Sequence, residues 1–196
     1  MSDKRITLAD VLNWFEYEKV RDDMRRRVIQ LKRVRRVSVG RHLVFLFENR
    51  DTVLFQIQEM CRVERITADA KIQDEIDVYG ALLPAAGELS ATLMIEIQDK
   101  AQVKSILDGF LGIDVGRYVW MQVGRFAIPA EFEAGHSDEE KRKLSAVHFV
   151  RFPLSDAAIR VFRDEDVFLV VDHPAERART RLSEETKAVL LQDLAC

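Results

Sequence analysis

The sequence predicts an α+β protein in which a helical N-terminal part packs on a mixed, largely antiparallel sheet and a helix closes the C-terminus. Three observations predict this class. Apolar residues recur every three or four positions through the first 83 residues, which is the helical period. Residues 89–98 instead alternate with a period of two, as in a half-buried strand. Only short helices stand between the later strands, which favours antiparallel pairing over a doubly wound α/β fold.

The N-terminal part is predicted to hold four helices and one short strand. A short helix begins at Thr7, whose hydroxyl can cap it, and a longer helix follows and ends or is redirected at Gly40. Asn49 and Thr67 are suited to cap two more helices. Residues 43–47 are predicted to form a buried strand, because five apolar residues stand together between turn-forming residues.

The rest of the chain is predicted to be richer in strands. Pro84 and Gly87 interrupt the helical pattern, so a subdomain break near residues 83–88 is possible within a single domain of residues 1–196. Gly124-Arg125 predicts a hairpin turn. The expected elements are a strand at 89–98, a helix after 99, hairpin strands at 118–123 and 126–132, strands at 146–152 and 167–172, a short helix from 155 and a closing helix at 184–194.

Composition limits the classes of protein that this chain can belong to. Its 196 residues are 47% apolar and 32% charged, which suits one substantial core. No apolar run approaches the roughly 20 residues of a membrane-spanning helix, and no secretory signal is recognisable, so a soluble cytoplasmic protein is expected. The two cysteines, Cys61 and Cys196, form no CxxC pair. They supply neither a disulfide framework nor the ligands of a thiolate zinc site, and Cys61 is expected to be a buried apolar residue.

Charge is distributed unevenly along the chain. Residues 21–41 contain nine Lys or Arg and two Asp, a local charge of +7, although the net charge of the chain is −3. On a helical wheel, the apolar stripe consists of Val20, Met24, Val28, Leu31 and Val34. The opposite, basic face consists of Arg25, Arg26, Lys32, Arg33 and Arg36. This face could contact a phosphate backbone, but no aromatic platform accompanies it, so nucleic-acid binding is the less favoured interpretation and a solvated face is preferred.

A candidate pocket is predicted in the C-terminal half, around carboxylates and histidines. Glu131 and Glu133 stand two apart on a predicted strand and so project from one face. With His148 and His173 they could form a metal site or an acid–base pair. The remaining members of the candidate pocket are Arg151 and Asp172, and His136 lies nearby in the sequence. No spacing matches a motif such as HExxH, so ordinary hydrogen-bonded or surface residues remain the favoured alternative.

Glu64 is a separate candidate, as a possible buried acid. Helical projection places it in the middle of the stripe formed by Val53, Ile57 and Met60, where a carboxylate must be paired or must shift its pKa. The alternative is that the helix ends near Ile66 and that Glu64 reaches solvent.

Several sequence blocks together resemble an uncharacterised bacterial family catalogued as a domain of unknown function, family 3501. The blocks are residues 35–40 (RRVSVG), 46–50 (LFENR), 53–60 (VLFQIQEM), 87–93 (GELSATL), 129–135 (PAEFEAG) and 145–153 (SAVHFVRFP). The resemblance covers nearly the whole chain, which implies one functional unit, and it transfers no activity. It implies an accessory role in redox metabolism, with a redox-related protein partner. His148 and Arg151 lie inside a block.

The sequence therefore favours a cytoplasmic binding or accessory protein. A metal-dependent enzyme or metalloprotein that uses Glu131, Glu133, His148 and His173 is the first alternative, and nucleic-acid binding through the basic face from Arg25 to Arg36 is the second. Whether the protein is an enzyme, which cofactor or metal it holds, and whether it forms a homo-oligomer all stay open.

Overall fold

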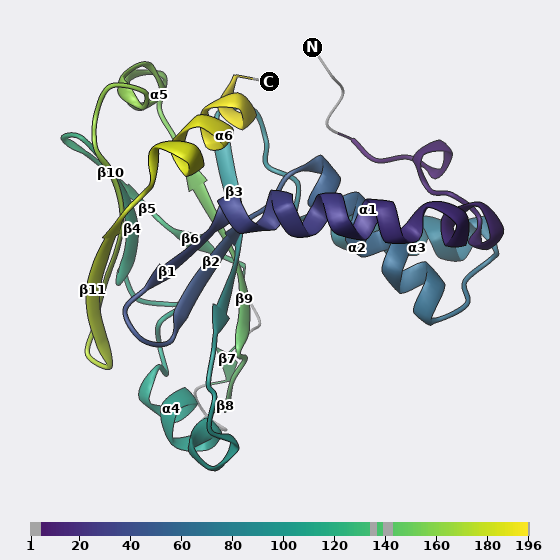
Figure 1. Ribbon diagram of the computed structural model, residues 1–196. Coiled ribbons are helices and arrows are strands. Elements are labelled where there is room, and N and C mark those ends of the chain that lie inside the picture. Colours follow the sequence, from purple (N-terminus) through teal and green to yellow (C-terminus); the bar gives the residue numbers. More distant parts are fainter. Residues whose placement is uncertain (1–4, 134–136, 139–142, 196) are drawn as a thin grey trace.

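The computed structural model describes residues 5–133, 137–138 and 143–195, and it divides into a helical arm and a two-sheet sandwich (Figure 1). The helices are η1 (Leu8–Asp10), α1 (Trp14–Arg35), α2 (Arg50–Val63), α3 (Asp69–Gly80), η2 (Lys100–Gln102), α4 (Val103–Gly109), α5 (Asp156–Val161) and α6 (Glu184–Leu194). The strands are β1 (Arg36–Val39), β2 (Leu43–Phe47), β3 (Glu88–Ile95), β4 (Val119–Val123), β5 (Phe126–Pro129), β6 (Glu131–Phe132), β7 (Ser137–Asp138), β8 (Lys143–Leu144), β9 (Val147–Pro153), β10 (Val167–His173) and β11 (Glu176–Arg181).

Two antiparallel sheets form the sandwich. The five-stranded sheet has the order β1-β2-β3-β9-β6, the four-stranded sheet has the order β11-β10-β4-β5, and β7 pairs with β8 as a separate ribbon. Only Ala130 separates β5 from β6, and its backbone N–H donates to the Val119 carbonyl at 2.9 Å. The chain therefore passes directly from one sheet into the other. The predicted α+β class with antiparallel pairing and a closing C-terminal helix is confirmed.

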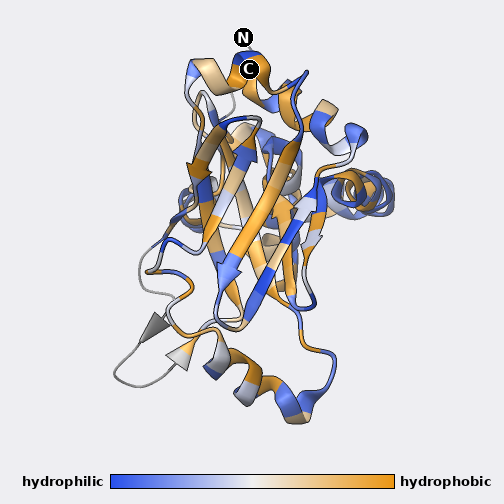
Figure 2. Ribbon diagram, turned by 90° about the vertical axis from the view of Figure 1, so that its left-hand side faces the viewer, coloured by the Kyte–Doolittle hydropathy of each residue, from blue (hydrophilic) through white to orange (hydrophobic). Residues whose placement is uncertain are grey.

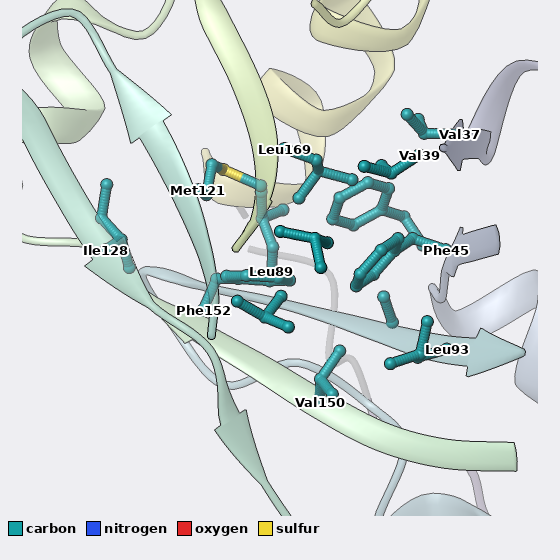
Figure 3. Packing of buried hydrophobic residues seen from close by; sticks show 14 of the residues in the cluster. Val37, Val39, Phe45, Leu89, Leu93, Met121, Ile128, Val150, Phe152 and Leu169 are labelled. Carbon is teal, nitrogen blue, oxygen red and sulfur yellow. The ribbon is translucent and has the colours of Figure 1, made fainter. Parts of the chain in front are cut away.

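The main core lies between the two sheets (Figure 3). In β3, the residues from Leu89 to Ile95 at every second position are buried, as the period of two predicts. Phe45 and Leu93 from the five-stranded sheet meet Met121 and Leu169 from the four-stranded sheet, and all four side chains are fully buried. Such a core contributes most of the hydrophobic stabilisation of the sandwich.

The helical arm consists of η1, α1, α2 and α3 and extends away from the sandwich (Figure 1). It has its own small apolar cluster, formed by Ile6, Val53, Ile57, Cys61 and Ile76. The expectation that Cys61 packs as a buried apolar residue is thus confirmed. The chain enters the arm twice, first through α1 and again through α2 and α3, with β1 and β2 of the sandwich in between.

An ion pair and two backbone contacts fasten the arm to the sandwich. Arg35 at the end of α1 donates two hydrogen bonds to Asp193 of α6, at 2.6 and 3.0 Å. Ser90 of β3 donates to the Leu82 carbonyl at 2.6 Å, and Arg151 of β9 donates to the Ala81 carbonyl. Both carbonyls belong to the segment that follows α3.

Three features differ from the sequence-based expectations. The long helix ends at Arg35 rather than near Gly40, because Val37 and Val39 alternate with polar residues and are buried as β1. Gly40 makes the turn to β2 with a φ of +68°, which favours glycine. β11 was not anticipated, since it has no large apolar residue; Figure 2 shows it as a hydrophilic strand beside β10. Helix α3 begins at Asp69, with Ala68 rather than Thr67 at its N-cap.

Within the described residues, no helix combines the length and the apolar character that crossing a membrane requires.

Candidate functional site

Three of the predicted pocket residues lie together on the outer face of the five-stranded sheet. Glu131 of β6 is the register partner of Arg151 of β9, and Glu133 follows with its N–H bonded to the Phe149 carbonyl at 3.0 Å. Glu131 and Glu133 are both exposed, in line with the prediction that they share one face. They border a groove of about 280 Å³, here called the outer groove, which is lined by Glu48, Ala81, Leu82, Ser90, Ala91, Glu131, Phe132, Glu133, Phe149, Val150 and Arg151.

The strongest polar contacts of the outer groove serve to hold the arm. Arg151 forms an ion pair with Glu88 and also donates to the Ala81 carbonyl. Ser90 donates to the Leu82 carbonyl, as described above. A guanidinium that is held by a carboxylate and a carbonyl has a fixed position, because each hydrogen bond is assisted by charge. Arg151 therefore ties the segment after α3 to the sheet.

Glu48 is a buried acid that the sequence analysis did not single out. Its side chain lies at the end of β2 and the residue is 8% exposed. One carboxylate oxygen accepts a hydrogen bond from the Thr52 hydroxyl and the other from the Thr92 hydroxyl, both at 2.6 Å. Alternation along β2 places Glu48 on the outer face, but its burial depends on α2 and could not be predicted from the strand alone.

The two histidines of the predicted pocket lie in other surroundings. His148 points to the inner side of the sheet, where it is fully buried, and its Nε2 bonds to the Ser145 carbonyl at 2.8 Å. His173 lies at the end of β10, stacked on the Phe110 ring at 5.6 Å and against the edge of Tyr118. Its Nδ1 accepts from the Ala175 N–H at 3.2 Å. Burial lowers the pKa of the His173 imidazole, because desolvation disfavours its charged form.

The structure does not bring Glu131, Glu133, His148 and His173, the residues of the alternative metal site, into one place. The two carboxylates lie on the outer face of the sheet, whereas the two imidazoles are buried in separate places. Among the residues that the structure describes, no group of three or more His, Cys, Asp and Glu side chains is arranged to hold a metal ion. Asp172 is exposed and pairs with Arg177 at 3.1 Å. His136 lies outside the described residues.

Glu64 is not a buried acid. Helix α2 ends at Val63, and Glu64 is its C-cap, with an exposed side chain. The next residue, Arg65, has a φ of +54° and turns the chain away. The alternative in which the helix ends and the carboxylate reaches solvent is the one that the structure shows.

The predicted basic face is divided between two elements. Arg25, Arg26 and Arg33 are exposed on α1, and Lys32 is half-buried there. Arg36 is not part of the helix but begins β1, and its side chain pairs with Glu96. Arg26 pairs with Asp23. In the described part of the chain, no ion pair involves Arg25, Arg27 or Arg33.

The apolar stripe of α1 is only partly covered. Val28 is buried, Met24, Leu31 and Val34 are half-buried, and Val20 is exposed. A groove of about 340 Å³, here called the α1 groove, runs beside the stripe. It is lined by Met24, Arg27, Val28 and Leu31 of α1 and by Asp51 and Leu54 of α2. The structure leaves the stripe half open, with α2 on one side of it.

The fold and these surfaces define a two-part α+β protein with a helical arm whose longest helix, α1, is basic. The chain belongs to the family described as "Protein of unknown function (DUF3501)", whose model matches residues 5–194. It is also similar to a solved crystal structure from Burkholderia pseudomallei, described as a novel protein of unknown function. The two chains are 34% identical, with a TM-score of 0.89, and the match covers 96% of this chain and 98% of the other. No curated protein matches. The redox role that the resemblance implied gains no support from these findings.

Proposed function

We propose that this protein is a non-enzymatic binding protein that holds an acidic, amphipathic helix of a protein partner in the α1 groove. The observation that carries the proposal is the half-open apolar stripe of α1 beside Arg27, which forms no ion pair within the described residues. Apolar surface that stays open along a helix pair is the feature by which helix-in-groove recognition works, since the partner buries its own apolar face there. Met24, Leu31 and Leu54 supply the apolar floor.

Charge selects the chemistry of the partner. Arg27 of α1 lines the groove and forms no ion pair within the described residues, and Asp51 lines it from α2. An aspartate or glutamate side chain beside the apolar face of a partner helix can pair with the Arg27 guanidinium. Complementary charge of this kind raises the association rate and fixes the orientation of the partner, and salt weakens it.

The same observations favour a protein partner over nucleic acid. A phosphate backbone would use the arginines, but it would bury none of the apolar floor formed by Met24, Leu31 and Leu54. An amphipathic helix uses both features at once. Binding of DNA or RNA is therefore the outcome that argues against the proposal.

The test is a selection of displayed 16-residue helical peptides on the purified protein, followed by fluorescence anisotropy. We expect the selected peptides to combine an apolar face with acidic flanks, and to bind at least tenfold more weakly to Leu31→Asp. The matched control is Val63→Asp, which changes an exposed valine of α2 outside the groove lining and should leave affinity unchanged. Peptides without acidic residues, binding that Leu31→Asp does not alter, or tighter binding of duplex or single-stranded nucleic acid would overturn the proposal.

A further inference from the structure

The far end of the arm carries a concentration of exposed apolar side chains. Leu8, Leu12, Trp14 and Phe15 lie there and are here called the arm tip. Phe15 is 72% exposed and Trp14 is 45% exposed, and their rings meet edge to face at 5.3 Å. In Figure 1 this start of α1 is the part of the arm farthest from the sandwich. Aromatic residues exposed on a projecting element are typical of an interaction surface, because burying them contributes more than burying smaller side chains.

A hollow lies directly beside these side chains. It has a volume of about 150 Å³ and is here called the tip pocket. Its apolar lining comes from η1, α1, α2, α3 and the segments between them, and includes Leu8, Val11, Leu12, Trp14, Cys61, Ile66 and Ile72. The arm tip therefore presents the exposed Phe15 ring in contact with Trp14, which itself lines the hollow.

The Gln58, Tyr17 and Arg62 side chains of the tip pocket already have polar partners within the chain. Gln58 accepts from the Leu12 N–H at 2.9 Å and donates to the Leu12 carbonyl at 2.8 Å. The Tyr17 hydroxyl donates to Glu59 at 2.5 Å, and Arg62 pairs with Glu18. A polar ligand would have to compete with these bonds, whereas an apolar side chain would leave them intact. The hollow is thus suited to an apolar occupant.

We infer that the occupant is Phe15 of a second copy of this chain, and that two copies join arm tip to arm tip around a two-fold axis. A two-fold interface uses the same patch on both molecules, so the patch must be complementary to itself. A projecting phenylalanine next to an apolar hollow meets that requirement, since each copy gives one ring and receives one. This contact lies apart from the α1 groove and does not depend on the proposed function.

Most charged side chains around the arm tip are paired, which suits self-association. A two-fold axis brings identical charges near one another, and pairing within each chain reduces their repulsion. Lys19 pairs with Glu16 at 2.7 Å, Arg62 with Glu18, and Arg50 with Asp10. Asp69, which lines the tip pocket, forms no ion pair within the described residues. The C-terminal half of α1 differs, because its unpaired arginines would repel those of another copy. The interface therefore forms at the tip and leaves the basic half of α1 free.

The test is sedimentation equilibrium of the full chain from about 1 to 100 μM, with Phe15→Asp and Thr67→Trp as variants. Thr67 is exposed and lines the tip pocket, so a tryptophan there can occupy the hollow without entering the core. We expect a dimer for the unchanged chain and at least a tenfold weaker dimerisation constant for each variant. The matched control is Ile29→Asp, an exposed apolar residue of α1 away from the tip, which should dimerise normally.

Far-ultraviolet circular dichroism and thermal unfolding of each variant establish that the fold is intact. In the Trp120→Phe background, Trp14 is the remaining tryptophan, and its emission should move to shorter wavelength as the protein concentration rises. A monomer throughout the concentration range would overturn the inference. So would a dimer that survives Phe15→Asp, because the contact would then lie elsewhere.

Discussion

Replacing Arg35 by methionine should loosen the arm from the sandwich and destabilise the whole protein. The Arg35 side chain is 3% exposed and that of Asp193 is 13% exposed, so the pair is largely shielded from water. Removing the guanidinium takes away the positive charge and the two hydrogen bonds that Arg35 gives to the Asp193 carboxylate. Breaking a buried pair in this way typically costs about 3–5 kcal/mol. Because Asp193 keeps some contact with solvent, we expect the lower value, about 3 kcal/mol.

The assay is urea unfolding followed by tryptophan fluorescence. The chain has two tryptophans, Trp14 in the arm and Trp120 in β4. In the Trp120→Phe background, the fluorescence of Trp14 reports on the arm. In the Trp14→Phe background, the fluorescence of Trp120 reports on the sandwich. A loss of about 3 kcal/mol corresponds to a fall in Tm of roughly 6–12 °C for a chain of this length. We also expect the arm to unfold at lower urea than the sandwich in Arg35→Met, since the variant removes their link.

The double variant Arg35→Met/Asp193→Leu tests whether the lost stability comes from the carboxylate that remains without Arg35 or from the loss of the Arg35 side chain itself. If the cost of Arg35→Met comes from the carboxylate left without its cation, replacing both partners by apolar residues should recover most of the lost stability. The control Arg33→Met, on an exposed position of the same helix, should change stability by less than about 0.5 kcal/mol. A loss below about 1 kcal/mol for Arg35→Met, or a double variant as unstable as the sum of the two single variants, would refute this reasoning.

Three further predictions concern the arm and the core. Glu59→Gln should destabilise the arm by about 1–3 kcal/mol at pH 7, because the carboxylate accepts hydrogen bonds from Arg21 and Tyr17. The Arg21 guanidinium lowers the pKa of Glu59, so this stabilisation is complete above the ordinary carboxyl pKa of about 4.3 and is lost as pH falls through the lower folded-state pKa. Urea midpoints of both proteins should converge as pH falls through the folded-state pKa of Glu59, and a constant gap would contradict the assignment. Burial lowers the pKa of His173, so the unchanged protein should lose stability as pH falls from about 6.5 towards that lower pKa. His173→Phe should flatten this part of the profile, and an unaltered slope between pH 7 and 5 would show that another group is responsible. Ile57→Ala should cost about 2–5 kcal/mol, because Ile57 is fully buried in the arm cluster, and the loss should be larger when read from Trp14 than from Trp120.

The sequence correctly predicted those helices and strands that are specified by residues close to one another in the chain. Asn49 caps α2 through its side chain, which accepts from the Thr52 N–H at 3.0 Å, and both residues are neighbours in the chain. The alternation from residue 89 onwards likewise fixes β3, because each position shows its face by itself. β1 was not predicted, because Val34 and Val37 continue the helical spacing of α1. Residues 36–39 form a strand because they pair with β2, which their own spacing does not reveal.

In the candidate pocket too, the sequence predicts relations between neighbouring residues but not contacts between distant elements. Glu131 and Glu133 share a face because they stand two apart, and the sequence predicts this correctly. His148 and Arg151 stand three apart on β9, so the same rule sends them to opposite faces. The sequence does not show which helix or strand packs against each face of the sheet. The burial of Glu48 under α2 and the open stripe of α1 both depend on how helices distant in sequence cover the sheet and one another.

The bond between α1 and α6 has a consequence for the order of events on the ribosome. Arg35 and Asp193 are 158 residues apart, so α1 emerges and folds long before its counterion is translated. Until then, the nascent arm is joined to the growing sandwich by the chain links to β1, β2 and β3 and by hydrogen bonds such as that from Thr52 to Glu48. The Arg35–Asp193 pair therefore joins the arm to α6 only when almost the whole chain has been translated.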